Sequence, residues 1–139
     1  MARKAISGTE ALILDSSAIL AAIFREPDYA RVLDRIGNAE SVGVGAPTFV
    51  ESAIVLSSRL QRDARPVLNE FLRQAGAELI PLGPEHVDAA VDAFLRYGKG
   101  RHPAALNFGD CLTYAIAAAA GVPLLYTGSD FVQTDIDRA

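Results

Sequence analysis

The sequence predicts an α/β domain built around a mainly parallel sheet, and three observations point to this fold class. Short apolar runs, the pattern of strands buried on both faces, alternate with longer segments whose apolar residues recur at helical spacing. Glycine and proline separate the two kinds of segment. At 139 residues, with no repeat and no linker, the chain fits one domain. We expect a loose N-terminal leader in residues 1–10 and a single domain in residues 11–139.

Four short apolar runs predict the strands. They lack the alternation of a strand that has one face in water, so we expect them to be covered by helices on both sides. Because helical segments separate them, the connections should be right-handed crossovers between parallel strands. In chain order, the expected strands are residues 12–14, 42–44, 79–80 and 124–126.

Capping residues and prolines predict the first three helices. Ser16 and Ser17 supply hydroxyls that can cap the first helix, and Pro27 suits the first turn of the second. Thr48 is the expected cap of the third helix, whose buried face should carry Val50, Ala53, Ile54 and Ser57. The three helices are expected over residues 18–24, 27–35 and 49–62.

The last three helices follow from the same signals. Pro66 and Pro84 mark the starts of two helices, and Gly76 and Gly121 mark the ends of two. The helix that begins at Pro84 should bury one apolar face, made of Val87, Ala90, Val91, Phe94 and Leu95. The three helices are expected over residues 65–75, 84–95 and 110–120.

Composition excludes several classes of protein. The formal net charge of −4 argues against a protein that coats nucleic acid indiscriminately, although an enzyme can grip a few phosphates through a metal and a local basic loop. A single cysteine permits no internal disulfide, which fits a reducing, cytoplasmic setting. The uncharged run over residues 111–129 is interrupted at Gly121 and Pro123, so we expect a buried helix and strand and no membrane span.

Four acids occupy comparable places beside the predicted sheet. Asp15 ends the first strand, and Asp130 lies just beyond the last. Glu51 and Asp110 lie near the starts of helices that can border the same crevice, where sites form in parallel sheets. Crowded carboxylates are unfavourable unless they share protons or bind a cation, and Mg²⁺ prefers oxygen ligands. We therefore predict that these four carboxylates meet and hold a divalent metal ion.

Each acid, taken alone, also has an ordinary structural interpretation. Asp15 can cap the helix that follows it. Glu51 lies three residues after Thr48, and Asp110 three residues after Asn107, which is the spacing of a capping box. Asp130 follows Gly128 and Ser129 and can be an ordinary turn residue. Only the metal-site interpretation explains the positions of all four acids with a single cause.

Neighbouring polar residues are candidates for supporting roles. Ser16 and Ser129 each follow or precede a proposed ligand and can hydrogen-bond a carboxylate or a bound water, beyond their use as capping or turn residues. Lys99 and Arg101 lie in a basic loop rich in turn residues. We interpret them as candidates for binding the substrate phosphates, with an ordinary solvated turn as the alternative.

Taken in order, these residues resemble the PIN-domain ribonuclease toxins of the VapC type. The motifs that carry the resemblance are residues 14–18 (LDSSA), 46–51 (APTFVE), 98–104 (GKGRHPA), 106–111 (LNFGDC), 128–131 (GSDF) and 134–136 (TDI). The resemblance implies a compact three-layer α/β/α sandwich and Mg²⁺- or Mn²⁺-dependent cleavage of RNA. It also implies a cognate antitoxin protein and a homodimer. The family's acidic quartet corresponds to Asp15, Glu51, Asp110 and Asp130, and its polar residue after the first aspartate to Ser16.

We therefore expect a metal-dependent endoribonuclease toxin that hydrolyses RNA to 5′-phosphate and 3′-hydroxyl ends. One alternative is a catalytically inactive PIN-like module that binds an antitoxin or another protein partner. An antitoxin segment can place an arginine among the acids, as a bidentate ion pair in place of metal. Another is a phosphate-transfer receiver with Asp15 as acceptor. That fold needs a second acid beside Asp15 and a late lysine, and the sequence has neither, since Lys99 is the last lysine.

Overall fold

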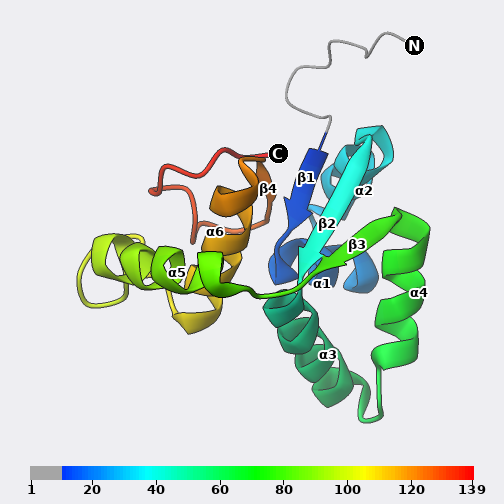
Figure 1. The fold of residues 1–139 in the computed structure, drawn as a ribbon. Coiled ribbons are helices and arrows are strands. Elements are labelled where there is room, and N and C mark those ends of the chain that lie inside the picture. The colour runs from blue at the N-terminus through cyan, green and yellow to red at the C-terminus, as the bar shows by residue number, and fades with distance from the viewer. Residues whose placement is uncertain (1–10) are drawn as a thin grey trace, which may run out of the picture.

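The computed structural model describes residues 11–139, and the predicted leader, residues 1–10, lies outside the described residues. Strands and helices alternate along this part of the chain as the sequence predicts (Figure 1). No helix within residues 11–139 is both long enough and apolar enough to cross a membrane. The elements are β1 (Ala11–Leu14), α1 (Ser16–Phe24), α2 (Tyr29–Asn38), β2 (Ser41–Gly45), α3 (Ala46–Leu60), α4 (Arg65–Ala75), β3 (Ala77–Ile80), α5 (Pro84–Tyr97), α6 (Phe108–Ala120) and β4 (Leu124–Leu125).

The four strands form one parallel sheet in the order β3-β2-β1-β4. Leu14 at the end of β1 is in register with Val44 of β2 and Leu125 of β4, so these strands end at the same edge. The arrowheads of β1 and β2 point toward the first turns of α1 and α3 (Figure 1). Parallel strands thus bring the segments that carry the four acids to one side of the molecule.

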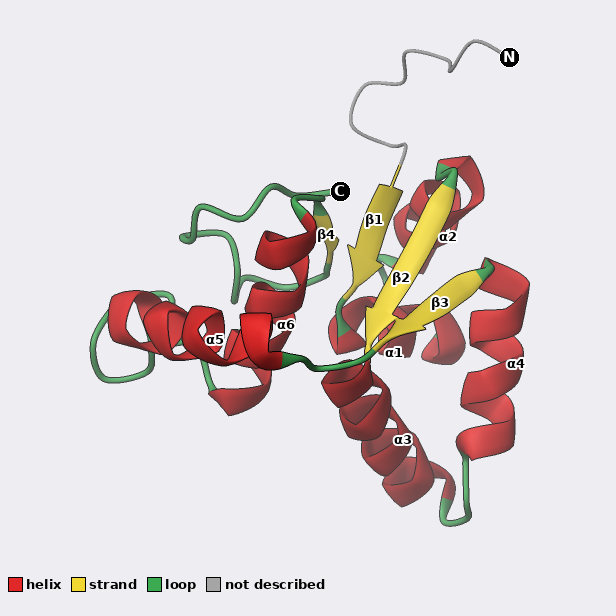
Figure 2. Cartoon of the chain, in the orientation of Figure 1, coloured by secondary structure: helices red, strands yellow, loops and turns green. Residues whose placement is uncertain are grey.

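Apolar side chains pack on both faces of the sheet. Figure 2 shows the helices that flank the strands. Leu12 and Leu14 of β1 are buried in a cluster with residues of α1 to α4. Ile13, which points to the opposite face, is buried in a second cluster with residues of α5 and α6. The three-layer α/β/α arrangement with a parallel sheet is therefore confirmed.

Three helix starts differ from the sequence predictions. Asp15, and not a serine hydroxyl, is the N-cap of α1. The second helix begins at Tyr29, two residues after Pro27, and continues through Asn38. The predicted Thr48 cap of α3 is wrong: Gly45 is the N-cap, and the Thr48 hydroxyl is buried at 2.9 Å from that of Thr113.

The predicted helix ends at two glycines are confirmed. Gly76 ends α4 and Gly121 ends α6, each with a φ of 68°. This left-handed conformation lets their amides bond the last helical carbonyls at little steric cost.

The predicted buried faces of α3 and α5 are largely wrong. Ile54 of α3 is 64% exposed and Val91 of α5 is 54% exposed, and their apolar neighbours on both helices are similarly open to solvent. Of the predicted residues only Ala90 is buried, and the other buried positions lie elsewhere on the two helices. The buried residues are Thr48, Ser52 and Leu56 on α3 and His86, Ala90, Ala93 and Tyr97 on α5.

Candidate active site

The structure brings the segments of all four predicted acids to the carboxyl edge of the sheet. Asp15 follows β1 directly, and Asp110 lies in the first turn of α6. Glu51 lies in α3, and Asp130 lies in the segment that follows β4. The negative charges of Asp15, Glu51 and Asp130 all act on the Asp110 carboxyl and raise its pKa. Asp110 therefore lies in the electrostatic field of the other three acids.

Asp15 is the most buried of these acids, with 5% of its surface exposed. Its Oδ2 accepts hydrogen bonds from the Ser17 amide at 3.1 Å and the Ser17 hydroxyl at 2.5 Å. Burial raises the pKa of Asp15 from 3.8 to about 6, the bonds from Ser17 oppose the rise, and the charge of Glu51 adds to it. The same Ser17 oxygen accepts the Thr127 amide at 3.0 Å and so ties the segment after β4 to this carboxylate.

Asp110 belongs to a capping box. Its amide donates to Asn107 Oδ1 at 2.8 Å, and its Oδ2 accepts the Asn107 amide at 3.1 Å. Burial raises the pKa of Asp110 to about 7, and the charges of Asp130, Asp15 and Glu51 add to the rise against the bond from Asn107. Asp110 is thus a helix cap and also a carboxyl that resists ionisation.

Glu51 is not part of a capping box, because α3 begins at Ala46 and Thr48 lies inside its first turn. Its carboxylate lies against Gly109 at the start of α6. A Cβ atom added at Gly109 would lie 3.1 Å from Oε1 of Glu51 and 3.3 Å from Oε2. The absence of a side chain at Gly109 therefore leaves room for the Glu51 carboxylate beside Asp110.

The four acids can offer a divalent cation only oxygen donors, which suits Mg²⁺ or Mn²⁺. The raised pKa values of Asp15 and Asp110 show that full ionisation is unfavourable here, a penalty that a cation offsets. In the conformation of this structure, no three His, Cys, Asp or Glu side chains of residues 11–139 lie close enough together to hold one ion. Binding through three carboxylates therefore requires some of these side chains to turn.

The predicted supporting residues have different outcomes. Ser17, which the sequence analysis treated only as a helix cap, makes the side-chain bond to Asp15, whereas the contact from Ser16 comes from its backbone. The Ser129 carbonyl accepts the Val132 amide at 3.3 Å within its own turn. A hydroxyl two residues after an N-cap aspartate is the sequence signal that identifies Ser17.

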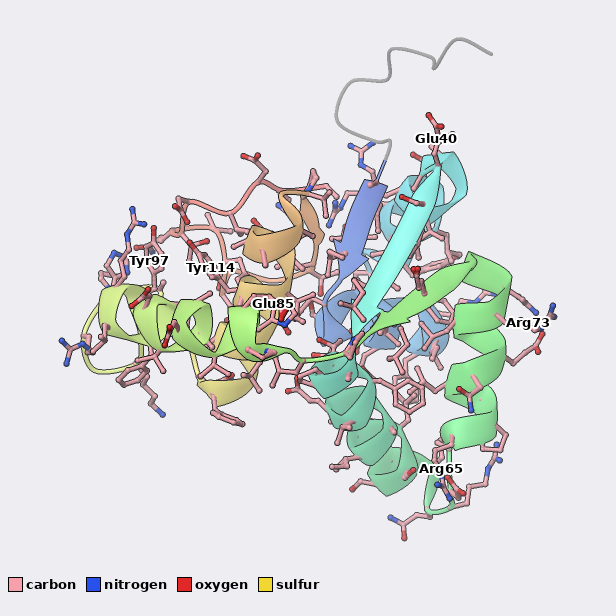
Figure 3. All side chains as sticks on the ribbon, viewed as in Figure 1. Glu40, Arg65, Arg73, Glu85, Tyr97 and Tyr114 are labelled. Atoms are coloured by element: carbon pink, nitrogen blue, oxygen red, sulfur yellow. The ribbon has the colours of Figure 1, made fainter. Side chains whose placement is uncertain are left out.

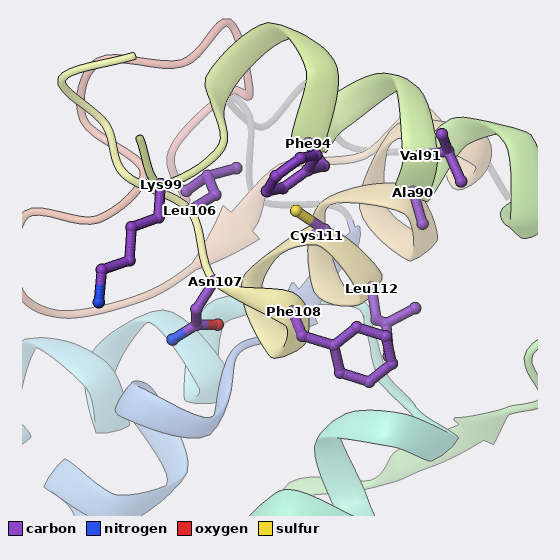
Figure 4. Close-up of a pocket in the computed structure, with 9 residues that line it drawn as sticks. All are labelled: Ala90, Val91, Phe94, Lys99, Leu106, Asn107, Phe108, Cys111 and Leu112. Carbon is purple, nitrogen blue, oxygen red and sulfur yellow. The ribbon is translucent and has the colours of Figure 1, made fainter. Parts of the chain in front are cut away.

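The two basic residues have different surroundings. Lys99 lines a hollow together with Asn107 and Phe108 at the start of α6 (Figure 4). Arg101 instead donates from Nε to the carbonyl of Leu95 at 3.1 Å, at the end of α5. Its guanidinium is therefore partly occupied in capping that helix.

An apolar surface extends from the start of α6 across α5 and α3. A hollow of about 480 Å³ lies between α5 and α6 (Figure 4), and one of about 430 Å³ lies between α3 and α6. Phe108 and Leu112 line both hollows, and Phe108 is 80% exposed. We call this the α3–α5–α6 surface; it consists of Val50, Ile54, Val55, Val91, Phe94, Phe108 and Leu112 with their neighbours.

Comparison with known sequences gives matches over nearly the whole described chain. Residues 12–137 match the PIN domain family. Ribonuclease VapC36 of Mycobacterium tuberculosis is 43% identical over 127 residues, which cover 91% of each protein. A ribonuclease VapC of Mycolicibacterium smegmatis is 36% identical over 125 residues, which cover 90% of this chain and 97% of that protein.

Comparison with solved structures gives the same fold. The crystal structure of Mycobacterium tuberculosis VapC20, a sarcin-ricin loop cleaving toxin, superposes with a TM-score of 0.75 at 12% identity and covers 92% of this chain and 98% of that one. A chain of VapBC2 from Rickettsia felis, bound to a DNA fragment from its promoter, superposes with a TM-score of 0.71 at 14% identity, covering 92% and 96%. At these identities the superpositions show the shared fold.

Proposed function

This chain belongs to the PIN-domain family of VapC ribonucleases, and from that membership and its site we propose that it is a metal-dependent endoribonuclease, the toxin of a toxin–antitoxin pair. The observation that carries the proposal is the position of the four acid-bearing segments at one edge of the sheet, where the charges of Asp15, Glu51 and Asp130 act on the Asp110 carboxyl. We place its action in the cytoplasm, where its one cysteine, the buried Cys111, stays reduced.

The four acids would hold Mg²⁺ or Mn²⁺ through carboxylate oxygens or bound water. A bound ion would supply a water molecule of lowered pKa and would offset the charge of the phosphoryl oxygens and the leaving group. Ser17 orients Asp15 and favours its ionised form, and Asn107 does the same for Asp110 through its backbone amide. Lys99, beside Asn107, is our candidate for contacting the RNA backbone.

The proposed reaction is hydrolysis with cleavage of the bond between phosphorus and the 3′ oxygen. Water supplies the oxygen that joins the phosphorus, so the products carry 5′-phosphate and 3′-hydroxyl ends. The RNA 2′-hydroxyl is not the nucleophile, and preference for RNA over DNA must come from shape and from contacts to that hydroxyl.

We propose two protein partners. The first is a cognate antitoxin, in line with VapBC2, one chain of which has the same fold. Four crowded carboxylates suit an antitoxin arginine, which can form a bidentate ion pair in place of metal. The second partner is another copy of this chain, which would cover the α3–α5–α6 surface. Its hollows are lined almost wholly by apolar atoms and its residues come from three helices, as in the core of an obligate interface.

RNA cleavage by protein free of antitoxin tests the proposal. Wild type, Asp15→Asn, Asp110→Asn and the control Asp88→Asn, which alters an exposed acid of α5, are incubated with structured RNAs in Mg²⁺, Mn²⁺ or EDTA. A sarcin-ricin RNA belongs among the substrates because VapC20, which has this fold, is a sarcin-ricin loop cleaving toxin. We expect metal-dependent cleavage by wild type and Asp88→Asn only.

Two results would contradict the nuclease. Equal cleavage by all four proteins would indicate a contaminating enzyme. No cleavage in any metal, together with tight binding of the antitoxin, would favour the alternative of an inactive module that binds its partner.

A further inference from the structure

The segment that carries Asp130 has no regular secondary structure. It runs from Thr127 to Asp137, between β4 and the end of the chain, and we call it the Asp130 loop. The Asp130 side chain is exposed, and it must stay near Asp110 if the two are to bind one ion. Contacts elsewhere in the loop therefore decide where this carboxylate lies.

Two contacts fix the first half of the loop. The Thr127 amide donates to Ser17 Oγ at 3.0 Å, which ties the start of the loop to the residue that also bonds Asp15. Phe131 is 1% exposed, and its ring packs 5.4 Å from that of Tyr126. Asp130 therefore lies between two anchored positions of the loop, the Thr127 amide before it and the buried Phe131 ring after it.

The second half of the loop is fixed through Asp135. The Tyr114 hydroxyl donates to Asp135 Oδ1, and Arg96 Nη1 donates to Oδ2 at 3.2 Å. The Asp135 amide donates to the Tyr97 hydroxyl at 3.2 Å, and the two tyrosine rings lie 5.9 Å apart (Figure 3). Because both carboxylate oxygens and the amide have partners on α5 and α6, we call these contacts the Asp135 clamp.

Tyr114 connects the clamp to the candidate metal site. It lies four residues after Asp110 on α6, so one helical turn carries both the acid and the clamp. The path from Asp110 through Tyr114 and Asp135 back to Asp130 is short, and its first step is rigid helix. The clamp can therefore set the separation of the Asp110 and Asp130 carboxylates.

We propose that Asp135 is a positioning residue, which through Tyr114 and Tyr97 holds the Asp130 loop so that Asp130 and Asp110 bind the same divalent ion. The inference rests on the proposed nuclease and adds a residue outside the four acids. Asp135 itself is not a ligand candidate, because its two oxygens already accept bonds from Tyr114 and Arg96. Residues that orient metal ligands typically change metal affinity or activity by about 10- to 100-fold.

The test compares Tyr114→Phe and Asp135→Asn with two controls. Tyr29→Phe removes a hydroxyl on α2, where the ring contacts Arg25, and Asp137→Asn changes an exposed acid two residues beyond the clamp. Mn²⁺ affinity is measured by titration calorimetry and loop protection by amide hydrogen exchange. We expect about 10-fold weaker Mn²⁺ binding in Tyr114→Phe, with faster exchange confined to residues 127–136. Asp135→Asn should show a smaller loss, because its amide oxygen can still accept from Tyr114.

Cleavage at saturating Mn²⁺ separates positioning from a general structural role. If the clamp positions a ligand, excess Mn²⁺ restores most of the wild-type kcat to Tyr114→Phe. Unchanged Mn²⁺ affinity in both variants, beside a wild type that binds Mn²⁺ and cuts RNA, would overturn the positioning role alone. A wild type that neither binds Mn²⁺ nor cuts RNA would overturn the proposed nuclease, and this inference with it.

Discussion

Asp110 combines two roles that sequence reasoning treats as alternatives. Its backbone and carboxylate close a capping box with Asn107, and the same carboxylate lies in the field of the other three acids. Asp15 likewise caps α1 and is buried at the end of β1. The cap holds each side chain in place, and the burial makes its negative charge unfavourable. The structural role at these positions is therefore compatible with the metal-binding role that we propose for them.

Replacing Asp15 by asparagine should stabilise the protein while abolishing RNA cleavage. Burial raises the pKa of Asp15 to about 6, so its ionised form destabilises the fold above that pH. Asparagine keeps an oxygen to accept from Ser17 and carries no charge. In EDTA at pH 8 we expect the free energy of unfolding to rise by about 1–3 kcal/mol, measured by chemical denaturation.

The exposed Asp88→Asn control should change neither stability nor cleavage. An Asp15→Asn protein less stable than wild type at pH 8 would show that charged hydrogen bonds from Ser17 outweigh the burial of the charge.

Adding a methyl group at Gly109 should impair the site without unfolding the protein. The new Cβ would lie 3.1 Å from Oε1 of Glu51, which is tighter than ordinary contact, and the exposed Glu51 side chain can move away. We expect Gly109→Ala to keep its melting temperature and to bind Mn²⁺ more weakly, by about 10-fold, in calorimetric titrations. The matched control is Gly37→Ala in α2, where no atom lies within 4 Å of the added Cβ. Equal Mn²⁺ affinity in both variants would argue against a role for Glu51 in holding metal.

At the scale of the element, α3 and α5 show that the sequence can predict an apolar helix face correctly and still be wrong about whether that face is buried. Both helices have apolar stripes, but these stripes face solvent, and α5 packs on α6 through Ala90, Ala93 and Tyr97. Helical periodicity identifies a stripe and does not say what covers it. The open stripes are the α3–α5–α6 surface, which we assign to a second copy of the chain.

Charges introduced on this surface should separate the proposed dimer. Ile54→Glu on α3 and Val91→Glu on α5 each place a carboxylate on an exposed apolar position, so the monomer should tolerate them and the interface should not. We expect monomers by sedimentation velocity, where wild type sediments as a dimer. Leu79→Glu, at a 54% exposed position on edge strand β3, is the control and should stay dimeric. A wild type that sediments as a monomer at all concentrations would remove the second copy from the proposal.

At the scale of the whole molecule, the fold crowds negative charge into one place, and this crowding has a pH dependence. Asp15 and Asp110 have pKa values of about 6 and about 7 in the folded protein, against 3.8 ordinarily. Between about pH 4 and pH 7 the folded state therefore binds more protons than the unfolded state, and its stability falls as pH rises. Acids with lowered pKa values, such as Glu70 at about 2, act below this range.

We expect the melting temperature in EDTA to fall from pH 5 to pH 8 and then to level off. Mn²⁺ should raise the melting temperature more at pH 8 than at pH 5, because protons and metal compete for the same carboxylates. The double variant Asp15→Asn/Asp110→Asn should show neither effect. A wild-type melting temperature that rises from pH 5 to pH 8 without metal would contradict the raised pKa values.

The order of strands and helices, the parallel sheet and the helix ends at Gly76 and Gly121 could be predicted because they depend on local signals. Apolar runs, prolines and glycines act within a few residues of where they stand. The start of α3 could not be predicted in this way. Thr48 resembles a cap in sequence, but its hydroxyl is buried and hydrogen-bonded to that of Thr113, which lies 65 positions further along the chain.

The sequence alone determined that four acids would border a parallel sheet and that the strands would bring their segments to one edge, since strand direction and side-chain type are local properties. Only the tertiary structure decided that Ser17 bonds Asp15, that Gly109 makes room for Glu51, and that Asp135 is held by two tyrosines from different helices. These contacts depend on which residues are close in space. Helix packing decides that, and the spacing of the residues along the chain does not reveal it.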